Sequence, residues 1–289
     1  ETELKSTKMM KRMLIAGFIF CVISLQGFAQ EGKLDKGKES LKTSSSSSSS
    51  STTKSNSKSR RSNRNNNDSF ADFFFAEFFI KLFAYTAYGV AVETPFEKDG
   101  RMHYADIANY PYQESNYGNF IYTDSTNYNI TRLDITNNFV MENSNLYGNN
   151  FGVNFRFLKR FALDVDYLYL VEKVNGTKDS FSLYSALLKY YRVRTQRFDA
   201  WFGLGMMHVG SDVDETGFGI GLGAEWFIKK PISLGVSHKW TNINQQEVHK
   251  TKLLLKYHLK NYHISSGYEH FKIGVSKIDS FSVGIGASF

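Results

Sequence analysis

The side chains best suited to chemistry are histidines and carboxylates that gather around three polar segments in the C-terminal half. They are His208, Asp212, Asp214, His249 and His270, with Glu215 beside them. A histidine held by a carboxylate can serve as a general base, so this set is the candidate for a hydrolytic site acting on lipid A or peptides. The spacing follows no catalytic motif, and Asp212, Asp214 and Glu215 lack the remaining ligands of an EF-hand. We therefore expect no metal and no cofactor.

The elements that would position these residues are β-strands, as the last ten residues show most clearly. In Ser280–Phe289, large apolar residues alternate with serine and glycine. A period of two places one set on each face of a strand. A large apolar face opposite a small, weakly polar face suits a strand with lipid on one side and a crowded barrel interior on the other.

Regular alternation begins at residue 132 and predicts ten strands, although eight or twelve would also fit. The predicted strands span 132–141, 150–158, 161–172, 181–193, 198–209, 217–228, 232–242, 250–259, 262–270 and 279–289. Their connections alternate between tight basic turns and longer polar segments, as in membrane barrels with short periplasmic turns and longer outer loops. With Phe289 at the periplasmic end, an even number of strands places the N-terminal arm in the periplasm too.

The same alternation assigns charged residues of both signs to the barrel interior. The predicted interior network comprises Arg156, Asp164, Asp166, Glu225, Lys239, Lys252, Lys256 and Glu269. A barrel of about ten strands is narrow and filled by its side chains. We therefore expect ion pairs that satisfy one another and fix the strand register. A narrow conducting pore is the alternative.

Aromatic residues, which make up 16% of the chain, are predicted to form belts at the two membrane–water interfaces. Trp226, Tyr257, Tyr262 and Phe289 fall at the periplasmic ends of the predicted strands, and Trp240 and Tyr268 fall at the outer ends.

Two segments at the start of the chain are predicted to lie outside the fold. Residues 1–29 combine upstream residues with a secretory signal peptide, which has a basic start, an apolar core and a cleavage site after Ala29. The only cysteine, Cys21, lies within it, so no disulfide is expected in the mature chain. Residues 30–69 form a Ser-rich basic linker that we expect to be disordered.

The formal net charge is +7, yet residues 68–289 contain 22 basic and 23 acidic residues. The positive charge therefore belongs to the N-terminal part, and no nucleic-acid partner is expected.

Residues 70–131 form the last predicted unit before the barrel. The apolar stretch from Phe70 to Tyr85 is interrupted by Glu77 and Lys81, an i,i+4 pair. These charges favour a short amphipathic helix at the membrane interface or under the barrel rim, with a membrane-spanning helix as the alternative. The aromatic-rich remainder either plugs the barrel or lies beneath it in the periplasm.

The alternating strands of 132–289 and the terminal aromatic Phe289 resemble small bacterial outer-membrane β-barrels, of the OmpA/OmpX-like or ten-stranded kind. The resemblance implies an all-β, closed antiparallel up-and-down transmembrane barrel in the outer membrane of a Gram-negative bacterium. It also implies contact with outer-membrane lipid and lipopolysaccharide, and insertion by the barrel assembly machinery.

Three hypotheses about function follow. The leading one is a non-enzymatic anchor, scaffold or accessory subunit whose protein partner binds through residues 70–131. The second is a narrow channel or small-solute transporter. The third is a hydrolase acting at the barrel rim.

Overall fold

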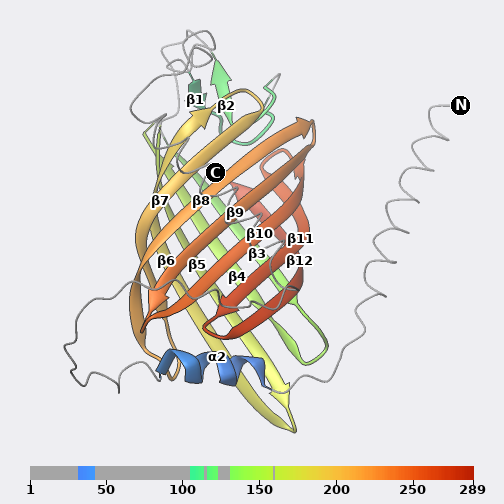
Figure 1. The fold of residues 1–289 in the computed structure, drawn as a ribbon. Coiled ribbons are helices and arrows are strands. Elements are labelled where there is room, and N and C mark those ends of the chain that lie inside the picture. The colour runs from blue at the N-terminus through green and yellow to red at the C-terminus, as the bar shows by residue number, and fades with distance from the viewer. Residues whose placement is uncertain (1–31, 43–104, 114–115, 123–130, 159) are drawn as a thin grey trace, which may run out of the picture.

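The computed structural model describes residues 32–42, 105–113, 116–122, 131–158 and 160–289. Ten of its strands form one closed barrel (Figure 1). They are β3 (Thr131–Met141), β4 (Leu146–Phe157), β5 (Phe161–Val174), β6 (Thr177–Arg194), β7 (Phe198–Val209), β8 (Glu215–Lys229), β9 (Ile232–Ile243), β10 (Gln246–Leu259), β11 (Tyr262–Ile273) and β12 (Ser276–Ser288). Each strand pairs antiparallel with its neighbours in the chain. The prediction of a closed ten-stranded antiparallel barrel is confirmed.

Closure depends on the seam between β12 and β3, the last and first strands of the barrel. Their register runs from Phe281 opposite Met141 to Ser288 opposite Asp134. Beyond it, Phe289 and Leu133 exchange both backbone hydrogen bonds, at 2.9 and 2.8 Å between N and O. A closed barrel pairs every strand on both sides and leaves no free edge.

We call the two ends of the barrel the Phe289 end and the helix end, after Phe289 and helix α2 (Lys33–Lys42), which lie at them. At the Phe289 end are the connection between β4 and β5 and the turns at 195–197, 230–231 and 260–261. At the helix end are the turns at 142–145, 175–176, 210–214, 244–245 and 274–275.

The connections are short at both ends, so the predicted contrast between tight turns and longer loops is wrong. The segments 173–180, 243–249 and 271–278, predicted as loops, are hairpins whose turns contain two residues each. At the first tip, Asn175 and Gly176 take φ values of 49° and 84°, as two-residue hairpin turns require. The polar residues around such tips continue the strands. The orientation inferred from loop lengths therefore stays a prediction.

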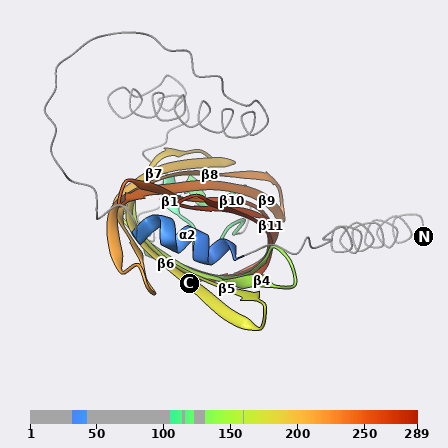
Figure 2. The same cartoon turned by 60° about the horizontal axis from the view of Figure 1, so that its bottom comes forward.

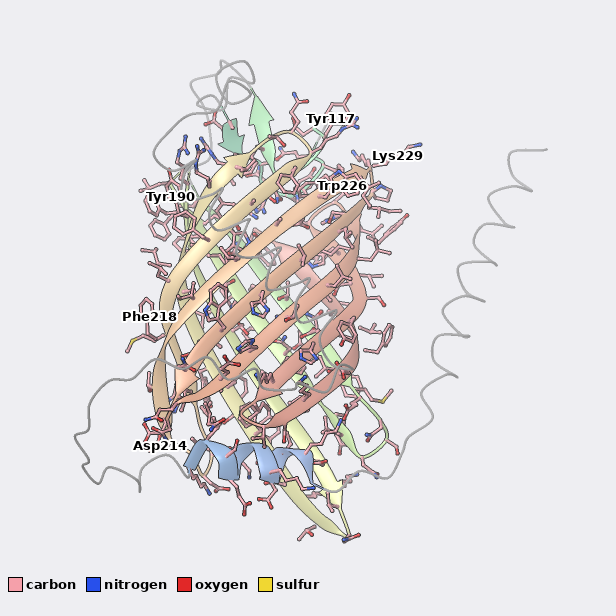
Figure 3. The ribbon with its side chains drawn as sticks, in the orientation of Figure 1. Tyr117, Tyr190, Asp214, Phe218, Trp226 and Lys229 are labelled. Atoms are coloured by element: carbon pink, nitrogen blue, oxygen red, sulfur yellow. The ribbon has the colours of Figure 1, made fainter. Side chains whose placement is uncertain are left out.

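The outer surface of the barrel carries an apolar band. Ile285 is 66% exposed and Leu253, Leu204 and Phe218 are exposed likewise. Trp226, Tyr257, Tyr262 and Phe289 are exposed at the Phe289 end, whereas Tyr268 is exposed and Trp240 half-buried toward the helix end. Figure 3 shows Trp226 and Tyr190 near one end and Phe218 and Asp214 toward the other. An apolar band of this extent on a closed barrel indicates lipid contact, and we treat the barrel as transmembrane.

Helix α2 (Lys33–Lys42) lies across the helix end of the barrel (Figures 1 and 2). It falls within residues 30–69, which were predicted to be disordered. Its buried residues are Leu34, Gly37, Lys38 and Leu41, which share one face of the helix. Among the residues that the structure describes, no helix combines the length and apolar character needed to cross a membrane.

Strands β1 (Ala105–Ile107) and β2 (Phe120–Tyr122) pair with each other at the Phe289 end (Figure 1). The segments before the barrel thus occupy both of its ends, not one. The predicted signal peptide at 1–29, the linker from 43 to 69 and the helix predicted near 70–85 lie outside the described residues.

The closed hydrogen-bonded ring predicts heat-modifiable migration. Because unfolding must break a continuous ring of strand pairs, the barrel should remain folded in cold SDS and migrate differently after boiling. Gel electrophoresis of heated and unheated samples measures this. Identical mobility of the two samples would contradict the closed barrel.

Candidate functional site: a closed interior chamber

Helix α2 is fixed to the barrel at both of its ends. Glu172 on β5 accepts hydrogen bonds from the backbone amides of Lys33 and Leu34, at 3.0 and 2.7 Å. These amides have no partner within the helix, and a carboxylate also favours the positive end of the helix dipole. At the other end, Asn244 Nδ2 donates to the carbonyl of Leu41 at 2.9 Å.

The side chains of α2 add an apolar contact and ion pairs. Leu34 and Leu41 are fully buried in a cluster of interior residues that includes Leu168 and Phe181. Lys38, only 3% exposed, contacts Asp179 on β6 and, at 3.0 Å, Asp212 in the turn at 210–214. Burial alone would lower the pKa of Lys38, but the hydrogen bonds to the two carboxylates outweigh this effect and raise it.

The segment containing β1 and β2 closes the Phe289 end by hydrogen bonds from buried arginines. Arg132 on β3 donates to the carbonyl of Ala108 at 3.2 Å and to Asn119 Oδ1 at 2.9 Å. Arg194 on β6 donates to the carbonyl of Ala105 at 3.1 Å. Phe120 is buried beneath the Arg194 guanidinium, 5.9 Å from the ring centroid. Breaking this closure would leave two buried guanidinium groups with fewer partners.

Between the two closures, ion pairs cross the barrel interior. Asp164 and Asp166 on β5 contact Lys239 on β9, and Asp166 also contacts Lys250 on β10. Lys189 on β6 binds Asp164 at 2.6 Å. Because β6, β7 and β8 separate β5 from β9 along the sheet, the contacts of Lys239 and Lys250 span the lumen.

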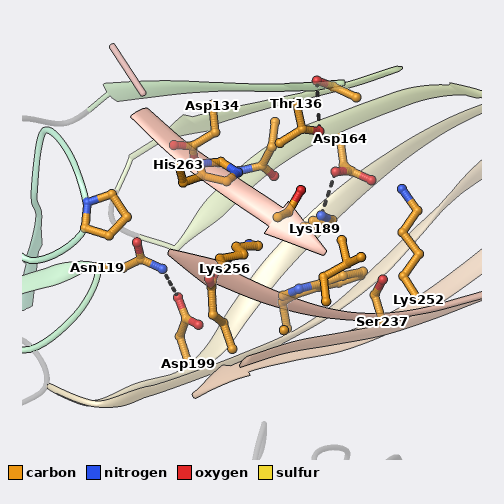
Figure 4. Close-up of a pocket in the computed structure, with 18 of the residues that line it drawn as sticks. Asn119, Asp134, Thr136, Asp164, Lys189, Asp199, Ser237, Lys252, Lys256 and His263 are labelled. Carbon is orange, nitrogen blue, oxygen red and sulfur yellow. Dashed lines mark hydrogen bonds and ion pairs between the residues drawn. The ribbon is translucent and has the colours of Figure 1, made fainter. Parts of the chain in front are cut away.

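A cavity of about 180 Å³ extends from this ionic cluster to the β1–β2 segment (Figure 4). Its wall is polar and charged, and most of the charges are paired. Lys256 binds Glu225 at 2.9 Å, and Asn119 Nδ2 donates to Asp199 at 2.8 Å. Asp134 accepts hydrogen bonds from Ser288 and Arg132. The chamber can hold water or a small polar solute.

The predicted interior residues lie as follows. Seven of them line the cavity: Arg156, Asp164, Asp166, Glu225, Lys239, Lys252 and Lys256. Glu269 is fully buried outside the lining and accepts a hydrogen bond from Asn150 at 2.7 Å.

Several members of the interior network were not predicted from the sequence. They are Arg132, Asp134, Lys189, Arg194 and Asp199. Arg194 lies near the end of β6, after an irregularity between Tyr191 and Val193 that shifts the pairing register. A shift of this kind exchanges the faces of the strand, which ends simple alternation.

The proposed rim site is not assembled as one cluster. His208 lies 3.6 Å from Asp214 and 3.0 Å from the Thr216 hydroxyl. His249 and His270 lie on the neighbouring strands β10 and β11, and β8 and β9 separate both from His208 on β7. There, His249 is 3.5 Å from Glu247, and His270 Nδ1 is 2.6 Å from Asp279.

Of the acidic residues in that rim set, Asp212 binds Lys38 of α2, whereas Asp214, the neighbour of His208, is 87% exposed. Within the described ranges, no three histidine, cysteine, aspartate or glutamate side chains gather as a potential metal site.

The buried ion pairs predict a large effect of Asp166→Asn. The substitution keeps the shape of the side chain but leaves Lys239 and Lys250 with less compensating charge in a buried site. We expect a loss of about 3–5 kcal/mol in the free energy of unfolding. Urea unfolding in detergent micelles measures this loss. Asp214→Asn, at an exposed position, should change stability by less than about 1 kcal/mol. Equal effects of the two substitutions would contradict the structural role of the network.

Comparisons with known proteins add the following. No family model matches the chain, and no curated protein matches it. Among solved structures, it is similar to an outer membrane channel from Pseudomonas putida F1, with 7% identity over 57% of this chain and 98% of that chain and a TM-score of 0.36. It is also similar to Ail from Yersinia pestis, with 15% identity over 55% and 99% of the two chains and a TM-score of 0.32.

A third similar structure is OprG from Pseudomonas aeruginosa, with 11% identity over 55% and 95% of the two chains and a TM-score of 0.31. TM-scores this low do not support any inference about the function of this chain. The barrel architecture rests on the ten closed strands of the chain itself.

Proposed function

We propose that this chain is an outer-membrane β-barrel that acts as a closed anchor and scaffold for a partner. The observation that carries the proposal is the closure of both barrel ends by segments that precede the barrel in the chain. Helix α2 covers one end and the β1–β2 segment covers the other. The predicted signal peptide and the lipid-facing apolar band support the outer membrane as its location.

The interior chemistry supports a closed state. A conducting pore needs a continuous water-filled path, and barrels that provide one have about sixteen strands. Here ten strands enclose ion pairs between β5 and β9 and between β5 and β10. Separating such pairs would leave buried charges without compensation, which costs several kcal/mol.

The two closures also suggest which segment of the chain binds the partner. Residue 42 is at the helix end and residue 105 is at the Phe289 end, so the barrel holds both attachment points of residues 43–104. We propose that residues 70–131, which overlap this segment, provide the partner-binding region.

The main alternative is a narrow channel or small-solute transporter. The charged chamber of about 180 Å³ favours it, since a solute of matching charge could occupy this space. Transport would require displacement of α2 or of the β1–β2 segment, and rearrangement of the central ion pairs.

The rim hydrolase has weaker support. His208, Asp214 and Thr216 lie near one another, but Asp214 and Thr216 are exposed to solvent. Among the residues that the structure describes, none around these groups excludes water or supplies preorganised donors for a developing oxyanion.

Conductance in planar bilayers separates the first two functions. A closed scaffold should give no steady current at moderate voltage, because both ends and the central cluster block the lumen. A steady single-channel current from the intact chain would reject the closed scaffold in favour of the channel.

Amine labelling tests the docking of α2 with an internal control. Lys36 and Lys38 belong to the same helix, but Lys36 is exposed and Lys38 is buried and ion-paired. In the intact protein, Lys38 should react with an acylating reagent at least roughly tenfold more slowly, since protection follows the free energy of local opening.

Leu41→Asp should abolish this difference, because it places a charge in the apolar cluster that holds the helix. Mass spectrometry of peptides reports both lysines in one sample. Equal labelling of Lys36 and Lys38 in the unmodified chain would show that α2 does not close the barrel.

A further inference from the structure

A second cavity, of about 400 Å³, lies at the Phe289 end. Its lining comes from the segment containing β1 and β2, from β8, from the turn before β7 and from the turn after β8. The lining residues are Tyr112, Tyr117, Arg197, Phe227, Ile228, Lys229 and Lys230. The cavity therefore lies where the segment containing β1 and β2 meets the barrel rim.

The aromatic wall of this cavity is held in place by several contacts. The Tyr112 ring packs edge-on against Phe227, with the ring centroids 5.4 Å apart. The Tyr112 hydroxyl donates to the carbonyl of Ile232 at 2.5 Å, and Lys230 Nζ donates to the Tyr112 carbonyl at 3.1 Å. The Arg197 guanidinium lies over the Tyr117 ring, 4.8 Å from its centroid. A wall fixed in this way is preformed for a ligand.

The charges of the lining are all of one sign. Arg197, Lys229 and Lys230 are exposed, and no lining residue is acidic. Arginine and lysine are the side chains that bind phosphate, arginine through its planar fork and lysine as a point charge. Three cations at one cavity therefore favour an anionic ligand with phosphate chemistry.

The position of the cavity also favours a ligand that has an apolar part. Trp226 and Ile228 follow each other on the outward face of β8 and are 51% and 41% exposed. Figure 3 shows Tyr117, Trp226 and Lys229 together at this end. Exposed tryptophan on a membrane barrel marks the level of the lipid headgroups. The cavity thus meets headgroups on its basic side and acyl chains along Trp226 and Ile228.

We propose that this cavity binds one anionic glycerophospholipid of the leaflet at the Phe289 end. Arg197 and Lys229 contact its phosphate, Lys230 adds positive charge, and Ile228 packs against the start of an acyl chain. The proposal rests on the transmembrane placement of the barrel and is independent of whether the barrel is a scaffold or a channel.

Native mass spectrometry of the full chain, released from mixed phosphatidylglycerol and phosphatidylcholine bilayers, tests the proposal. The unmodified protein should retain one phosphatidylglycerol in preference to phosphatidylcholine. The double variant Arg197→Gln, Lys229→Gln should lower the retained fraction at least about tenfold, because two charge-assisted contacts are lost. Both positions are exposed, and gel mobility before and after heating verifies that the variant folds.

A matched pair of substitutions controls for non-specific electrostatic attraction between anionic lipid and the Phe289 end. Arg160→Gln, Lys260→Gln removes the same number of charges from two other turns at the Phe289 end, outside the cavity. This variant should retain phosphatidylglycerol like the unmodified protein.

Three results would overturn the proposal. Equal loss in both double variants would mean that lipid is held only by the overall charge of this end. Unchanged retention in the cavity variant would mean that the lipid lies elsewhere. Displacement of the lipid by millimolar inorganic phosphate would mean that the cavity binds the free anion without an acyl chain. None of these results bears on the conductance of the barrel. A failure of the lipid-binding proposal can therefore be distinguished from a failure of the proposed scaffold role.

Discussion

A strand that crosses a membrane cannot leave its backbone groups or its interior charges without partners, because lipid offers none. Closure of β12 onto β3 satisfies the backbone. Satisfying the interior charges requires contacts across the lumen, where Asp166 on β5 reaches Lys239 and Lys250 on the far side. These contacts depend on the register of every strand between them, since a slip of one residue would turn the charges toward lipid. The ion pairs and the closed sheet therefore stabilise each other.

The glycines of β8 make room for this interior. A Cβ atom at Gly223 would lie 2.5 Å from the Trp201 ring, and one at Gly221 would lie 2.7 Å from Leu187. Large side chains of β6 and β7 thus fill the interior space next to the glycines of β8. Lys189 lies over the same Trp201 ring, 3.9 Å from its centroid, while it binds Asp164. The alternating glycines of β8 are explained by packing against these side chains, and they allow the ionic cluster to form in a narrow barrel.

The parts of the fold that follow a simple alternation were predictable from the sequence, and the parts that depend on distant contacts were not. In β12, β10 and β8, large apolar residues on the lipid face alternate with mostly small or polar residues on the inner face, so the period of two is clear. In β6, Phe181 and Leu183 face an apolar interior beneath α2, and the register shifts after Tyr191. The sequence of α2 is polar, and its helix depends on Glu172 and Asp179 from the β5–β6 hairpin and on Asn244 from the β9–β10 turn. No local pattern contains that information.

The two closures of the barrel differ in strength. Helix α2 buries two leucines, a contribution of roughly 3–6 kcal/mol that must offset the entropy of ordering ten residues. One carboxylate partner of Lys38, Asp212, is 61% exposed at a hairpin tip, where an ion pair contributes little. At the Phe289 end, Arg132 and Arg194 are almost completely buried and donate to carbonyls of the segment containing β1 and β2. Removing that segment would leave the two buried guanidinium groups with fewer partners. Any opening of this barrel should therefore begin at the helix end, and the aspartate–lysine cluster would still separate the exposed mouth from the chamber.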